Sequence, residues 1–219
     1  MLTLSPTVRR PMFIPRDGER LARRLAQLVI GLVLFGFGIG LMLQSHLGVP
    51  PWDVLHQGLT VRFGLTVGTW SVVVSFVVLL AWLPLGERFG PGTVLNAVII
   101  GLMIDVTAGL VPVPDAGWVA WLMLGFGILI IGVASGMYIG ARLGPGPRDG
   151  LMTGIARRGP SIRLTRAVIE VTVLAIGWLL GGTFGVGTVI FALAIGPLVQ
   201  FFLRRWEIVP TEPGALTPS

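Results

Sequence analysis

Long runs of apolar residues, separated by short segments that carry most of the charges, make up this 219-residue chain. Six of the runs are each about 20 residues long, which is enough for a helix to cross a hydrocarbon core of about 30 Å. They predict membrane-spanning helices at about 25–45, 69–86, 92–112, 117–141, 164–182 and 186–203. The pattern therefore predicts an all-α membrane protein with six transmembrane helices.

Arginine is distributed unevenly among the segments between these runs. The segments that six spans would place on one side of the membrane hold nearly all of it: Arg9, Arg10, Arg16, Arg20, Arg23, Arg24, Arg88, Arg142, Arg148, Arg157, Arg158, Arg163, Arg204 and Arg205. The opposite side has Arg62 alone. Because cytoplasmic loops carry the excess of Arg and Lys, both termini are predicted to be cytoplasmic, as an Arg-rich tail at 1–24 and a disordered tail at 207–219.

Two short motifs each occur twice along the chain. Leu-Gly-x-x-Pro-x-Asp occupies 47–53 and 143–149, at an offset of 96 residues, and Phe-Gly-x-Gly-Thr occupies 89–93 and 184–188, at an offset of 95. Spans one to three therefore match spans four to six, in repeats at 25–113 and 114–206. Because three is an odd number, the second copy enters the membrane from the opposite side. Such inverted-topology repeats recur in secondary transporters, with the substrate site near the repeat interface.

The Leu-Gly-x-x-Pro-x-Asp motif follows the first and the fourth span and is expected to break each helix. Its backbone-determining residues are Gly48 and Pro51 in one copy and Gly144 and Pro147 in the other. Asp53 and Asp149 are expected to N-cap short helices at about 52–60 and 148–157. These helices would lie at the surface or enter the membrane as re-entrant elements. The two carboxylates are then either simple caps or part of a pathway that the half-helices line or gate, and the two roles are compatible.

A few polar side chains fall inside the predicted spans, where ionisable groups are costly and mark candidate sites. They are Asn96, Asp105, Arg166, Glu170 and Gln200. Arg166 and Glu170 are spaced to pair on one helix face, as a structural pair or as part of a proton or substrate relay. Asp105 is a candidate site residue or a group solvated near the outer surface, and Gln200 is its equivalent in the second repeat.

Composition and motifs exclude several classes of protein. Hydrophobic residues make up 53% and charged residues 12% of the chain, against about a quarter charged in soluble domains. The net charge of +6 follows the predicted topology, so nucleic acid is not an expected partner. There is no Cys, no His-Glu-x-x-His zinc motif, no P-loop, and no His within a span that could activate Ser135. Neither an enzyme nor a bound cofactor or metal is expected.

With its repeated Leu-Gly-x-x-Pro-x-Asp segments, its Gly-Thr turns and its six spans, the chain resembles the bacterial YczE/YyaS/YitT family of membrane proteins, in particular the YczE-type branch. The likeness extends over about residues 22–206 and is most specific at 47–55. It implies a multi-pass protein of the bacterial cell membrane and carries no site residues over. Arg148 stands where the first copy of the motif has Trp52, so the two halves need not work alike.

Two functions remain open from the sequence. The first is a secondary transporter or permease for a small solute, suggested by the repeats, the broken motifs and the polar groups within the spans. The second is a non-transporting accessory or scaffold protein, which would bind a membrane protein partner or a second copy of itself through its glycine-rich helix faces. In both, the lipid bilayer is the surrounding medium.

Overall fold

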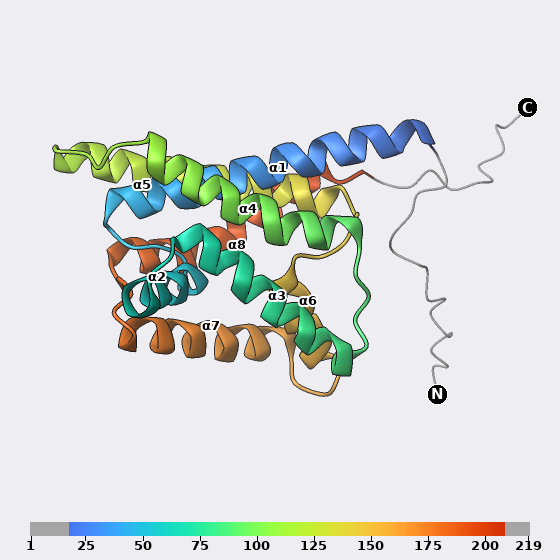
Figure 1. Ribbon diagram of the computed structural model, residues 1–219. Helices are drawn as coiled ribbons and strands as arrows, with labels where there is room; N and C mark the ends of the chain where they lie inside the picture. Colours follow the sequence, from blue (N-terminus) through green and yellow to red (C-terminus); the bar gives the residue numbers. More distant parts are fainter. Residues whose placement is uncertain (1–17, 209–219) are drawn as a thin grey trace, which may run out of the picture.

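The computed structural model describes residues 18–208, which form eight α-helices and, within that range, no β-strand (Figure 1). The helices are α1 (Gly18–Ser45), α2 (Pro51–Phe63), α3 (Val67–Leu85), α4 (Pro91–Leu110), α5 (Gly117–Gly140), α6 (Pro147–Ala156), α7 (Ile162–Leu179) and α8 (Val186–Trp206). Six long helices and two short ones therefore follow one another in the predicted order. Of the predicted tails at 1–24 and 207–219, residues 1–17 and 209–219 lie outside the described residues.

The first helix begins earlier than its apolar run predicts. Arg24, assigned by the charge pattern to a tail, is part of α1 and is 3% exposed. Its guanidinium donates hydrogen bonds to the carbonyl oxygen of Ala141 at 3.1 Å and to that of Ile208 at 3.3 Å. These acceptors lie at the C-terminal ends of α5 and α8, where helical carbonyls lack partners within the helix. The side chain of Arg24 therefore connects α1 to the ends of α5 and α8.

Five of the described helices are long and apolar enough to cross a membrane: α1, α3, α4, α5 and α8. The sixth long helix, α7, is shorter and carries Arg163, Arg166 and Glu170 within its 18 residues. Many large apolar side chains on the outside of the long helices are exposed, as lipid-facing side chains are in a membrane protein. The chain is accordingly a helical membrane protein.

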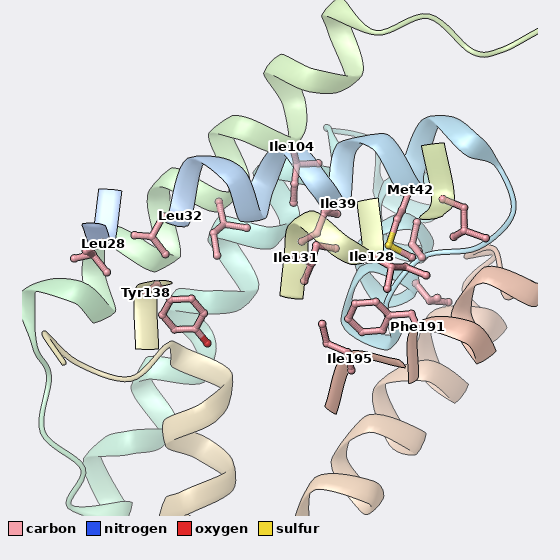
Figure 2. Packing of buried hydrophobic residues seen from close by; sticks show 14 of the residues in the cluster. Leu28, Leu32, Ile39, Met42, Ile104, Ile128, Ile131, Tyr138, Phe191 and Ile195 are labelled. Atoms are coloured by element: carbon pink, nitrogen blue, oxygen red, sulfur yellow. The ribbon is translucent and has the colours of Figure 1, made fainter. Parts of the chain in front are cut away.

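The helices form two layers (Figure 1). In one layer α1 packs against α4 and α5, and α5 packs against α8. Its core contains Leu28, Leu32, Ile39, Ile104 and Ile131, with Phe191 and Ile195 from α8 (Figure 2). In the other layer, each short helix packs against both α3 and α7. A smaller core there surrounds the fully buried Trp82.

Backbone contacts join each Leu-Gly motif to the Gly-Thr turn of the opposite half of the chain. The Gly187 N–H donates to the Leu47 carbonyl at 2.7 Å, and the Gly92 N–H donates to the Leu143 carbonyl at 2.9 Å. Gly48 adopts a φ of 122° and Gly144 a φ of 130°, in the region that favours glycine. A Cβ at either position would also lie 2.8 Å from an atom of the opposite threonine, so these glycines permit the contact.

Candidate functional site

A cavity of about 140 Å³ lies between the two layers and is the candidate site. Its charged lining comes from the layer with the short helices: Asp53, Arg148, Asp149, Arg166 and Glu170, together with the hydroxyls of Ser71 and Ser75. Its opposite wall is mostly apolar and comes from the other layer: Phe35, Ile100, Ile131, Ile139, Phe191, Ile195 and Val199, interrupted by Asn96, Ser135 and Tyr138. A polar wall faces an apolar one at the centre of the fold.

The N-terminal ends of both short helices border this cavity, but the two aspartates do not cap them as predicted. Each helix begins with the motif proline, Pro51 or Pro147, at its first position, and no side chain caps either one. Proline suits that position because it has no N–H to satisfy and its fixed φ is helical. The aspartates follow two residues later, in the first turn, so the predicted N-cap role is wrong and their carboxylates bond elsewhere.

Asp53 and its surroundings form a buried polar group at the start of α2. Both Asp53 and His56 are 0% exposed, and Asp53 Oδ1 is hydrogen-bonded to His56 Nδ1 at 2.9 Å. The Arg148 guanidinium approaches the same oxygen at 3.9 Å and lies 5.1 Å from the centroid of the Trp52 ring. The residues at equivalent positions of the two motifs, Trp52 and Arg148, thus stack on each other.

Three buried polar atoms in this group have no hydrogen-bond partner among the described residues: Asp53 Oδ2, His56 Nε2 and Trp52 Nε1. Leaving a buried polar atom unsatisfied costs about 1–3 kcal/mol. Such atoms in a native protein usually mark a bound water, ion or ligand or a functional strain. Because Trp52 and Asp53 line the cavity, we expect something polar to occupy it.

Asp149, in the first turn of α6, accepts a hydrogen bond from the Tyr138 hydroxyl at 2.5 Å. Figure 2 shows Tyr138 at the edge of the apolar cluster. Its ring packs edge to face against Phe35, with 5.9 Å between the centroids. Tyr138 therefore connects the apolar layer to the carboxylate of the short helix.

Arg166 and Glu170 form the ion pair that their spacing predicts, with 2.8 Å between Arg166 Nε and Glu170 Oε1. Their side chains are 52% and 26% exposed, although both line the cavity. Ser71 and Ser75, on α3 at the other side, are only 2% and 6% exposed. The charged lining on α7 is therefore partly exposed, whereas the lining on α3 is buried.

Of the other polar residues predicted within the spans, Asn96 lines the cavity, whereas Asp105 and Gln200 do not. Asp105 instead joins α4 to the start of α3, because it accepts hydrogen bonds from the Thr66 hydroxyl at 2.5 Å and the Gly68 N–H at 2.8 Å. Gln200 is exposed on α8 and is not part of the lining. Asp105 thus has a structural role in this conformation.

Tyr138 and His56 were not among the site residues predicted from the sequence. Tyr138 is the sole tyrosine of the chain and lies within a predicted span, which could have singled it out. His56 follows Asp53 by three residues, the spacing of neighbours on one helix face. Within the described residues, no three His, Asp or Glu side chains are grouped to hold a metal ion.

Comparison with known proteins identifies relatives over most of the chain. A model described as "Family of unknown function (DUF6198)" matches residues 22–204. An uncharacterised protein of Haemophilus influenzae is 41% identical over 192 residues, covering 87% of this chain and 88% of that protein. The uncharacterised membrane protein YczE of Bacillus subtilis is 34% identical over 191 residues, covering 85% of this chain and 88% of YczE.

A third relative is the uncharacterised protein YyaS of Bacillus subtilis, which is 29% identical over 184 residues, covering 80% of this chain and 89% of YyaS. No solved structure matches the chain. The resemblance to the YczE and YyaS proteins that the two motifs suggested is confirmed.

Proposed function

The chain belongs to the DUF6198 family, a family of unknown function, and we propose from its cavity that it is a secondary transporter or permease for a small solute. One observation carries the proposal. A charged cavity lies at the centre of an otherwise apolar helical protein, at the N-terminal ends of two short buried helices. In membrane transporters, interrupted backbone at depth is tolerated where it lines such a cavity, and substrate sites are built from such half-helices.

The proposed arrangement has six transmembrane helices in a bacterial plasma membrane, with α7 as the sixth. The positions of the three charged residues of α7 are consistent with a transmembrane helix. Arg166 and Glu170 line the cavity and pair with each other. Arg163 lies in the first turn of α7, from where a long side chain can extend to the membrane surface. The excess of arginine on one side supports cytoplasmic termini.

We further propose that the two halves are inverted repeats. The order long, short, long, long is repeated in α1–α4 and α5–α8. Thr66 and Ser161, 95 residues apart, cap α3 and α7 through equivalent hydrogen bonds, from Thr69 N and Leu164 N. The reciprocal bonds between the Leu-Gly motifs and the Gly-Thr turns connect the halves in the manner expected of a pseudo-two-fold axis. Three spans in each half would make their topologies opposite.

This symmetry relates a closed side of the cavity to an open one. On the closed side α3 and α4 approach so closely that a Cβ on Gly68 would lie 2.1 Å from the Gly101 carbonyl oxygen. The equivalent of Gly101 in the second half is Gly196, and a Cβ there would meet nothing within 4 Å. The cavity would thus be closed between α3 and α4 and open between the equivalent helices, α7 and α8. Alternating access requires such an arrangement in one of its two states.

Transport is tested by reconstituting the purified protein in liposomes. Solid-supported-membrane electrophysiology would record currents across a panel of small solutes and a pH step. A solute-dependent or proton-dependent current is expected, and Asp53→Asn, Asp149→Asn and Glu170→Gln should each reduce it. Asp115→Asn is the matched control, since Asp115 is exposed between α4 and α5 and outside the lining.

Electroneutral exchange gives no current, so uptake of radiolabelled solutes into the same vesicles accompanies the recordings. Equal signals from protein-containing and empty vesicles in both assays would refute transport. That result would favour the alternative function, an accessory protein for another membrane system. Co-purification of one defined membrane partner, unaffected by Asp149→Asn, would then be the supporting observation.

A further inference from the structure

We propose that the cavity binds a small organic cation of the quaternary ammonium class. This inference names the class of solute for the proposed function. It rests on that function because it takes the same cavity as the solute site. Its basis is the combination of an uncompensated carboxylate, a set of aromatic rings and the cavity volume.

The charges facing the cavity favour a cation. Three carboxylates and two guanidinium groups line it, which leaves one negative charge when all five are ionised. Glu170 is paired with Arg166 at 2.8 Å, and Asp53 has Arg148 at 3.9 Å. Asp149 forms no ion pair with any residue between 18 and 208, and its hydrogen-bond partner, Tyr138, is neutral. Asp149 is therefore the charge that a bound cation would match.

The helix termini do not reverse this preference. The N-terminal end of a helix attracts anions through its free N–H groups and its dipole. Here each short helix already carries a carboxylate in its first turn, Asp53 in α2 and Asp149 in α6. An anionic ligand would meet these carboxylates, whereas a cation would interact favourably with them.

Aromatic side chains supply the second part of a cation site. Phe35, Trp52, Tyr138 and Phe191 line the cavity, from four different helices. The faces of such rings attract cations, and cages of aromatic rings recognise quaternary ammonium groups. One such contact between a cation and a ring face already exists within the protein, since the Arg148 guanidinium lies 5.1 Å from the centroid of the Trp52 ring.

The unsatisfied atoms and the volume limit the ligand further. Trp52 is 6% exposed and Asp53 fully buried, and Trp52 Nε1 and Asp53 Oδ2 have no partner among the described residues. A ligand with a hydroxyl group beside its cationic centre could bond with one of them. The cavity volume of about 140 Å³ is close to that of a cavity known to hold benzene, about 150 Å³. Choline, a compact cation with one hydroxyl, fits this description.

Isothermal titration calorimetry on the full chain in lipid nanodiscs tests the inference. The probes are choline, its neutral isostere with carbon in place of nitrogen, and a carboxylate with the same branched carbon skeleton. We expect choline to bind at least about tenfold more tightly than the neutral isostere, since choline alone carries the charge that Asp149 and the ring faces attract. This comparison uses the unaltered protein and does not depend on any variant folding correctly.

Variants then locate the site. Asp149→Asn should abolish the preference for choline over its isostere, and Asp149→Glu should retain part of it. Asp115→Asn, which removes an exposed carboxylate outside the cavity, should leave the preference unchanged. Far-ultraviolet circular dichroism of each variant confirms that it is folded.

Equal binding of choline and its isostere, tighter binding of the carboxylate, or no detectable binding of choline would each overturn the inference. So would a preference that a folded Asp149→Asn protein retains. These results are independent of the transport assay. Choline binding with no flux of any solute of the panel would refute transport and leave the site intact, whereas flux of anionic or neutral solutes alone would support transport and overturn the ligand class.

Discussion

The contact between α3 and α4 can be tested with a pair of glycines at equivalent positions of the two halves. In Gly101→Ala the new Cβ would lie 2.5 Å from the Gly68 carbonyl oxygen and 2.5 Å from a methyl group of Val72. The first of these atoms is backbone and cannot turn aside, so α3 must move away from α4. In Gly196→Ala the new Cβ meets nothing within 4 Å.

The magnitudes follow from two opposing effects. Replacing glycine by alanine inside a helix favours folding by about 0.8–1.0 kcal/mol through backbone propensity, in both variants. Forcing an extra methyl group into a close-packed contact costs about 1–3 kcal/mol, in Gly101→Ala only. We therefore expect Gly101→Ala to have a free energy of unfolding about 1–3 kcal/mol below that of Gly196→Ala. The difference between the variants removes the shared propensity effect.

The assay is reversible unfolding by sodium dodecyl sulfate in mixed micelles, followed by circular dichroism. Labelling adds a second measurement, because the chain has no Cys and a single introduced one is unique. Ser75→Cys, at a position only 6% exposed, should react faster with a maleimide in the Gly101→Ala background than in the Gly196→Ala background. Equal unfolding free energies and equal labelling rates would refute the close helix contact and the closed side of the cavity derived from it.

Three further predictions address the loop glycines, the second core and the topology. Gly48→Ala should lower the free energy of unfolding by about 1–3 kcal/mol more than Gly64→Ala, because both positions have positive φ but only the Cβ at 48 would strike another segment; equal losses in mixed-micelle unfolding would contradict this. Trp82→Phe should cost about 1–3 kcal/mol, because the fully buried indole N–H donates to the start of α6 at 3.0 Å; an unchanged unfolding midpoint would remove that bond from the account. In right-side-out vesicles, Arg62→Cys should react with an impermeant maleimide and Arg88→Cys should not; the reverse would overturn cytoplasmic termini.

Which helices form could be predicted from the sequence, because a span and a helix break are local properties. An apolar run of sufficient length predicts a helix regardless of its neighbours. Pro51 and Pro147 break the chain and start the short helices because of their own fixed φ. The same local reasoning was wrong for Asp53 and Asp149. The proline occupies the first helical position, so each aspartate lies within the first turn and not at the N-cap.

The partners of the polar side chains could not be predicted, because they come from distant segments. Arg24 bonds to a carbonyl 117 residues away, and a pattern of charges alone assigns it to a polar tail. Asp105 has no partner nearby in sequence, but its hydrogen-bond donors lie 37 and 39 residues earlier. Whether such a group lines a site or joins two helices depends on how the helices pack, which a hydropathy pattern does not contain.

Differences between the repeats are nevertheless informative, because the proposed two-fold symmetry would bring equivalent positions to the same cavity. At the offset of 95 set by the caps Thr66 and Ser161, Ser71 and Ser75 correspond to Arg166 and Glu170, and all four of these residues line the cavity.

Gly68, which closes α3 on α4, corresponds to Arg163, which is exposed on α7. A backbone contact like that of the first half cannot form at an arginine. If α7 closes on α8, long side chains must make the contact, and the Arg166–Glu170 pair is placed at that opening. A closure beside α7 would therefore lack the backbone contact that joins α3 to α4, which agrees with the empty space beside Gly196.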